Sequence, residues 1–192
     1  MTNVIFAGVG GQGVILSTKV LMHVALSQGY DVKESEIHGM AQRGGSVDCH
    51  VRFGEQVHSP LIAPGTADFI VALELLEAAR RLDFLAPQGR IITDTRQIDP
   101  MPVLTGQMTY PDDLADWLDH HSNACCLVET GPALKILGSS RVLNVVMLGV
   151  LSQYLTFDAE TWQNSLKATV KPQHVDLNLH AFELGRTLLG SS

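Results

Sequence analysis

A run of glycines near the N-terminus constrains the fold of this chain more than any other feature. Residues 8–13 read Gly-Val-Gly-Gly-Gln-Gly, directly after an apolar stretch at residues 4–7 and directly before a helix-forming stretch at residues 14–27. Glycines at such a junction permit a tight turn and the close approach of a helix to a strand. Gly29 ends the expected helix, and residues 30–33 have the composition of a second strand. We therefore predict a strand–turn–helix–strand unit with a right-handed crossover.

The next segment adds a strand of a different kind. Apolar residues alternate along residues 46–53, the pair Gly54-Glu55 indicates a turn, and residues 56–58 could pair back as the second half of a hairpin. Such a hairpin would place an antiparallel strand in the sheet. This departs from the parallel sheet of a dinucleotide-binding domain.

Strands and helices then alternate, and the C-terminal part is helical. We expect strands at residues 68–73, 90–93 and 125–128, and helices at residues 74–85, at 112–120, from 130 or 131, at 159–168 and at 175–189. Asp158 is the expected N-cap of the helix that follows it, and Asn144, inside an apolar helical stretch, needs a hydrogen-bond partner. These elements predict one domain over residues 1–192. It is a three-layer α/β/α domain with a mixed, mostly parallel sheet, a Rossmann-like start, one antiparallel hairpin, and a helical C-terminal part from about residue 141.

The charge and the cysteine content argue against several kinds of partner and cofactor. The formal net charge is −7 without any basic stripe, so we expect no nucleic acid partner. No uncharged apolar run could span a bilayer and the first residues do not resemble a signal peptide, so we expect no membrane association. The three cysteines, Cys49, Cys125 and Cys126, form no Cys-x-x-Cys motif, and this odd number favours a reducing cytoplasm. An iron–sulfur cluster normally needs about four thiolates, so this chain cannot hold one alone. The histidines have no zinc-type spacing, so we expect no metal site.

The glycine run matches the pattern Gly-x-Gly-x-x-Gly in the strand-to-helix context where that pattern binds dinucleotide phosphates. The free N–H groups and the positive dipole end of the following helix favour an anion there. Glu34 or Glu36, near the end of the second strand, could contact a ribose. One interpretation is therefore a nicotinamide or flavin site, and another is that the glycines only let the helix pack on the sheet. The dinucleotide interpretation is weakened because a second glycine-rich motif, rather than a crossover helix, follows the second strand.

That second motif covers residues 34–46 and is rich in polar residues. Arg43 can hold a carboxylate or phosphate through two parallel bonds, and Gly44 and Gly45 permit exposed backbone amides. His38 could act as an acid or base near neutral pH. We take His38 and Arg43 as candidate catalytic residues, with a solvated surface loop as the alternative. The candidate cofactor-binding residues of the two motifs are Gly8, Gly10, Gly11, Gln12, Gly13, Gln42, Arg43, Gly44 and Gly45.

Both motifs resemble those of a known family. Residues 8–14 resemble the gamma subunit or domain of the 2-oxoacid:ferredoxin oxidoreductases, and residues 35–47 with 50–54 look specifically like the indolepyruvate member. The later stretches that agree are residues 67–74, 76–78, 98–100, 102–103, 144–149 and 181–185. The resemblance spans essentially the whole chain.

The resemblance implies a division of labour between subunits. Members of the family decarboxylate a 2-oxoacid on thiamine diphosphate, pass electrons through iron–sulfur clusters to ferredoxin, and deliver the acyl group to coenzyme A. This chain has neither a Gly-Asp-Gly thiamine motif nor cluster cysteines, so the resemblance implies a larger partner subunit that carries both cofactors. The chain would then be the small (beta) subunit of the indolepyruvate enzyme, not catalytic alone and without a cofactor of its own. It would close the active site, contact coenzyme A or the 2-oxoacid through its glycine loops, and meet ferredoxin only indirectly.

Two other functions remain open at this stage. One is a free-standing nucleotide- or flavin-binding oxidoreductase that uses the N-terminal glycine loop. The other is an interaction module whose loops only dock a partner. The low share of charged residues, 17%, fits a surface covered by a partner subunit, but apolar strands in a buried sheet explain it equally well.

Overall fold

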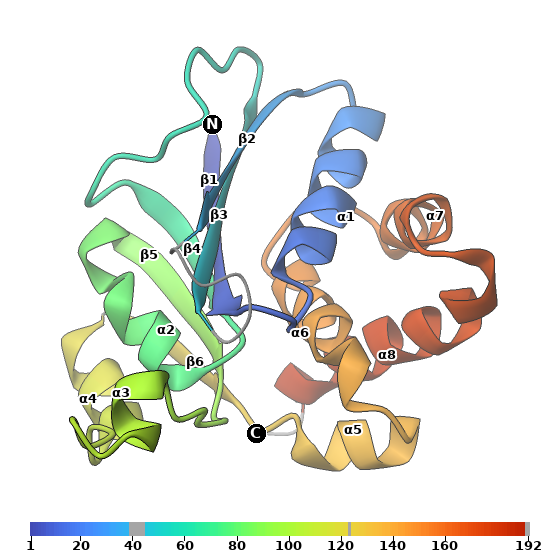
Figure 1. Ribbon diagram of the computed structural model, residues 1–192. Coiled ribbons are helices and arrows are strands. Elements are labelled where there is room, and N and C mark those ends of the chain that lie inside the picture. Colours follow the sequence, from blue (N-terminus) through green and yellow to red (C-terminus); the bar gives the residue numbers. More distant parts are fainter. Residues whose placement is uncertain (39–44, 123, 191–192) are drawn as a thin grey trace.

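The computed structural model describes residues 1–38, 45–122 and 124–190, and it has the three layers expected from the sequence (Figure 1). The strands are β1 (Thr2–Val9), β2 (Asp31–His38), β3 (Ser46–Gly54), β4 (Ala67–Ala72), β5 (Leu85–Asp94) and β6 (Cys125–Val128). The α-helices are α1 (Val14–Ser27), α2 (Leu75–Arg80), α3 (Met101–Leu104), α4 (Leu114–His121), α5 (Gly131–Leu137), α6 (Leu143–Ser152), α7 (Ala159–Thr169) and α8 (Val175–Thr187). Short 3-10 turns lie at Leu82–Phe84, Ser140–Val142, Pro172–His174 and Leu188–Gly190.

The strands form one six-stranded sheet in the order β2-β3-β1-β4-β5-β6. β1, β4, β5 and β6 are parallel neighbours, whereas β3 pairs antiparallel with both β1 and β2. The prediction of a mixed, mostly parallel sheet is therefore confirmed. The prediction that residues 56–58 pair with the antiparallel strand was wrong, because these residues form no strand. Val51 of β3 instead lies opposite Val4 on one side and Glu34 on the other, so β3 has hydrogen-bond partners along both of its edges.

The two faces of β1 belong to two different cores. Val4 and Phe6 pack toward α1 and the C-terminal helices, while Ile5 and Ala7 pack toward α2 and α4, and all four are at most 1% exposed. This alternation follows from the two-residue period of a strand. Figure 1 shows α1, α6 and α8 on one side of the sheet and α2, α3 and α4 on the other. The chain therefore has helices on both faces of the sheet.

Helix α6 is the centre of the helical layer and is buried along its whole length. It contacts β5 on one side and α8 on the other. Gly149 of α6 and Gly185 of α8 meet where the two helices cross, and a Cβ on Gly185 would collide with the Val146 carbonyl oxygen. The predicted helical C-terminal part is confirmed, and Asp158 caps α7 as expected by accepting a bond from the Thr161 N–H at 2.6 Å.

Several boundaries differ from the expected ones, and β2, expected at residues 30–33, extends to His38. The helix expected at residues 74–85 ends at Arg80, and β5 starts at Leu85, so the expected turn at residues 87–89 lies inside a strand. Gly89 makes this possible, since a Cβ there would lie 2.5 Å from the Ala67 carbonyl oxygen where the pairing of β4 with β5 shifts register. Within the described part of the chain, no helix has the length and apolarity needed to cross a membrane.

Candidate functional site

The glycine loop lies at the carboxyl end of β1, where neighbouring connections leave the sheet on opposite faces. After β1 the chain enters α1 on one face, and after β4, the parallel neighbour of β1, it enters α2 on the other face (Figure 1). Ligands of open α/β sheets bind in the crevice at such a point. A pocket of about 470 Å³ opens there. It is lined by Val9, Gly10, Gly11, Gly13, Val14, Ile15 and Val47.

The backbone geometry favours glycine at three positions of the loop. Gly11 and Gly13 have φ angles of 103° and 86°, in the left-handed region that side chains disfavour. A Cβ on Gly8 would lie 2.9 Å from both the Gln12 Oε1 and the Val14 Cγ2 atoms. Gly10 donates its N–H to the Gly45 carbonyl oxygen at 2.9 Å, which joins the first motif to the end of the second.

The Gln12 side chain is used inside the loop. Its Oε1 accepts from the Val9 N–H at 2.6 Å, and its Nε2 donates to the Leu73 carbonyl oxygen at 2.9 Å. Gln12 therefore ties the end of β1 to the residue that follows β4. Its contribution to a ligand site is to hold the loop in shape.

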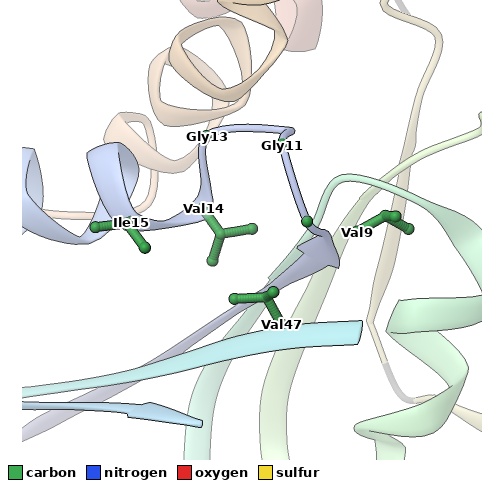
Figure 2. A pocket seen from close by; sticks show the side chains of 7 residues that line it. Val9, Gly11, Gly13, Val14, Ile15 and Val47 are labelled. Atoms are coloured by element: carbon green, nitrogen blue, oxygen red, sulfur yellow. The ribbon is translucent and has the colours of Figure 1, made fainter. Parts of the chain in front are cut away.

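The start of α1 offers backbone donors beside apolar walls. The first N–H groups of a helix have no partner within the helix and carry its positive dipole end. In the part of the chain that the structure describes, the N–H groups of Gly13, Val14 and Ile15 donate no hydrogen bond. Figure 2 shows the Val14 and Val47 side chains facing one another beneath the loop, on α1 and β3. The pocket can thus receive an anionic group at the helix end with an apolar portion against the valines.

The second motif is described only in part. Gln42, Arg43 and Gly44 lie outside the described residues, so their roles stay predictions. The backbone of His38 ends β2 opposite Val47, and its side chain also lies outside what is described.

A buried polar network follows the second motif and was not predicted. Ser46 donates its hydroxyl to Glu77 of α2, and Arg81 donates to Asp48 at 2.7 Å and to the Ser46 hydroxyl at 3.3 Å. Glu77 and Asp48 are 2% and 4% exposed. The sequence contains one sign of it, since polar residues alternate with the apolar ones along residues 46–53. The network fixes the exit of the second motif against α2, on the sheet face opposite α1.

The acidic residues considered for ribose binding are not beside the glycine loop. Glu34 and Glu36 lie on β2, and β3 separates β2 from β1 in the sheet. Burial, with the neighbouring Glu36 carboxylate second, raises the pKa of Glu34. In a dinucleotide-binding sheet the acidic residue ends the strand next to the glycine strand, so this geometry weakens the dinucleotide interpretation.

The cysteines do not fit an iron–sulfur cluster. Cys49 is buried, and burial raises its pKa to about 11. Cys125 and Cys126 lie on β6, at the far edge of the sheet from β3, and burial raises both of their pKa values. No group of three metal-ligating side chains occurs in the ranges that the structure describes. Three thiols in two separate places cannot form the usual four-thiolate ligand set.

Together, the mixed sheet and the glycine loop at the start of α1 define an α/β domain with a candidate ligand site at the carboxyl end of β1. Over residues 3–188 the chain matches the family model described as pyruvate ferredoxin/flavodoxin oxidoreductase, and it belongs to that family. It is 37% identical over 188 residues to the indolepyruvate oxidoreductase subunit IorB of Pyrococcus horikoshii, covering 95% of this chain and 93% of that protein. The same subunit of Archaeoglobus fulgidus is 38% identical over 187 residues, with 95% and 92% covered.

Solved structures share the fold at lower identity. The gamma subunit of a keto/oxoacid ferredoxin oxidoreductase from Geobacter sulfurreducens matches the whole of both chains with a TM-score of 0.71 and 21% identity. A 2-oxoglutarate:ferredoxin oxidoreductase from Magnetococcus marinus, with 2-oxoglutarate, coenzyme A and succinyl-CoA bound, gives a TM-score of 0.75 at 20% identity over all of this chain and 31% of that one. The resemblance inferred from the two motifs is confirmed, and the chain is a small, gamma-type subunit of a 2-oxoacid ferredoxin oxidoreductase. These relatives give no support to a free-standing flavin or nucleotide enzyme.

Proposed function

We propose that this subunit assists the oxidative decarboxylation of indolepyruvate, or of a related aryl pyruvate, by holding coenzyme A at the glycine loop. The observation that carries the proposal is the pocket at the start of α1, which combines backbone N–H donors with apolar walls. Coenzyme A presents matching chemistry, because its phosphates are anionic and its pantetheine arm is largely apolar. The 2-oxoglutarate:ferredoxin oxidoreductase of Magnetococcus marinus, 31% of whose chain matches this fold, was solved with coenzyme A bound. In this proposal the helix end takes a phosphate group and Val14 and Val47 contact the arm.

A larger subunit completes the enzyme. Thiamine diphosphate supplies the decarboxylation chemistry and iron–sulfur clusters carry the electrons to ferredoxin, and both are expected on that partner. The residues of this chain bind and orient the acyl acceptor, and they exclude water from it. His38 and Arg43 stay as proposed catalytic contacts to the 2-oxoacid or its acceptor. The three free cysteines agree with a cytoplasmic location for the complex.

Reconstitution tests this function directly. The larger subunit mixed with this chain should reduce a redox dye in the presence of indolepyruvate and coenzyme A, and the larger subunit alone should not. The chain alone should show no flavin absorbance. Restored dye reduction that does not depend on coenzyme A would count against the coenzyme role. A purified chain that carries a flavin would support the free-standing enzyme instead.

We also propose that the larger subunit covers the surface around α3. Met101, Leu104 and Met108 are 63%, 66% and 64% exposed. α3 lies on the carboxyl side of the sheet, where Met101 lines a small pocket with Val9 and Ser46 next to the glycine loop. Exposed apolar side chains gathered in this way are typical of protein interfaces. A partner seated here would also border the ligand pocket.

Leu104→Glu should weaken assembly with the larger subunit by about tenfold or more, since an unpaired carboxylate in an interface costs more than about 1.4 kcal/mol. Leu61→Glu is the matched control. Leu61 is also an exposed leucine, at 54%, but it lies between β3 and β4 at the opposite end of β1. Analytical ultracentrifugation or light scattering of the mixed subunits gives the dissociation constants. Equal effects of the two variants would refute the proposed location of the interface.

A further inference from the structure

Asn144, in the first turn of α6, contacts the glycine loop from the helical layer. Its Nδ2 donates to the Gly13 carbonyl oxygen at 3.1 Å, across a separation of 131 residues in the sequence. The side chain is 1% exposed and stands in an otherwise strongly apolar helix. A buried amide costs free energy unless it is hydrogen-bonded, and this bond satisfies the NH2 group but not the oxygen of the side-chain amide.

The bond acts on a peptide group that borders the pocket. The Gly13 carbonyl also accepts from the Leu16 and Ser17 N–H groups, at 3.0 and 3.2 Å. Because a peptide group is planar and trans, fixing this carbonyl along the helix fixes the Val14 N–H in the opposite direction. That direction leads out of the N-terminus of α1, where Gly13 and Val14 line the pocket. Asn144 therefore acts on the donor that an anion at the helix end would use.

Two further observations separate Asn144 from an ordinary buried polar residue. Its Oδ1 is buried and has no hydrogen-bond partner among the residues that the structure describes. Its amide also lies against the Gly13 α-carbon, where a Cβ would be 2.8 Å from Nδ2 and 2.9 Å from Cγ. An unsatisfied buried acceptor costs about 1–3 kcal/mol, which an apolar side chain at this position would avoid. The amide is thus retained at a cost, in direct contact with the ligand loop.

We propose that Asn144 is a positioning residue, which orients the Gly13–Val14 peptide so that the Val14 N–H faces the phosphate of the bound ligand. The inference rests on the proposed function for the identity of that ligand as coenzyme A. It adds that the helical C-terminal part sets the geometry of a binding loop at the other end of the sequence.

The test compares Asn144→Asp with Asn178→Asp in the assembled complex. Asn178 of α8 is 5% exposed, and its Nδ2 donates to the His174 carbonyl oxygen at 2.7 Å, so it is a buried asparagine with the same kind of bond but without a contact to the loop. Both changes keep the side-chain shape and remove the amide donor. Asn144→Leu serves as a second variant that adds no charge. We measure the KM for coenzyme A and the kcat, together with hydrogen exchange of the peptide that contains Leu16 and Ser17.

The expected result for Asn144→Asp is a KM for coenzyme A raised about tenfold, which corresponds to about 1.4 kcal/mol, with faster exchange of the Leu16 and Ser17 amides. Asn178→Asp should change neither. Unchanged exchange in both Asn144 variants, or equal effects of the Asn144 and Asn178 variants on KM, would overturn the positioning role. Faster exchange with an unchanged KM would uphold the control of the loop by Asn144 and refute coenzyme A as its ligand, which separates the two proposals.

Discussion

Gly13→Ala is expected to lower kcat/KM for coenzyme A by roughly ten- to a hundredfold in the assembled enzyme. The reason is the loss of one hydrogen bond to a charged group, which is worth about 1.5–3 kcal/mol. The backbone at Gly13 has a φ of 86°, and an added Cβ would lie 2.8 Å from the Asn144 Nδ2 atom. Relief requires either the Asn144 side chain or the first turn of α1 to move, and either movement disturbs the Gly13–Val14 peptide group that borders the pocket. Steady-state rates at saturating indolepyruvate with varied coenzyme A measure the effect.

Gly29→Ala is the matched control for backbone strain. Gly29 has a φ of 82°, close to that of Gly13, and a Cβ there would meet nothing within 4 Å. It follows the C-terminal end of α1, so the same helix receives similar strain away from the pocket. We expect a stability loss of about 1 kcal/mol without a change in the use of coenzyme A. A similar drop in kcat/KM for both variants would mean that strain in α1, rather than the ligand site, causes the effect.

Gly149→Ala is expected to be the most destabilising of the proposed changes, at about 3 kcal/mol. Its Cβ would collide with the Phe182 carbonyl oxygen and lie 2.9 Å from the Arg186 nitrogen. Since both are backbone atoms of α8, no side-chain rotation relieves the overlap and the two helices must separate. Thermal unfolding followed by circular dichroism should show a midpoint lower by roughly 6–12 °C, at about 2–4 °C per kcal/mol for a chain of this size.

Gly131→Ala is the control for the loss of a helical glycine. Gly131 begins α5, and a Cβ there would meet nothing within 4 Å. The change should alter stability by no more than about 1 kcal/mol, because alanine restricts the unfolded chain but suits the helical backbone before Pro132 less well than glycine. If Gly149→Ala were as harmless as Gly131→Ala, α6 and α8 would not be packed at backbone contact.

Several elements of the fold could be predicted from the sequence because their determinants are local. α1 starts at Val14 and ends at Ser27 as expected, since glycines flank a continuous apolar helical pattern. β6 has its expected bounds as well. Asp158 caps α7 because its carboxylate reaches the N–H three residues on. The short helix α3 was not expected, since four residues that include a proline carry little helical pattern.

The glycine loop found in the sequence borders a pocket in the structure, but the contacts of its residues could be predicted only in part. Gly10, Gly11 and Gly13 line the pocket, and Gly8 leaves room for Gln12 and Val14. The Gln12 side-chain amide forms hydrogen bonds with the backbone of Val9 and Leu73, so it stabilises the loop. No pattern within residues 8–13 could reveal this, because the partner of its Nε2 follows a different strand.

The sequence by itself determined the glycine turn between a strand and a helix, the three-layer α/β class and the family. Those follow from local periodicity, capping and motif composition. Only the tertiary structure decided that β3 is inserted between β1 and β2, that Ser46 and Asp48 bond to α2, and that Asn144 reaches Gly13. These are contacts between residues far apart in the chain. Their free energy depends on which surfaces meet in the folded molecule, and that information is not contained in any short stretch of residues.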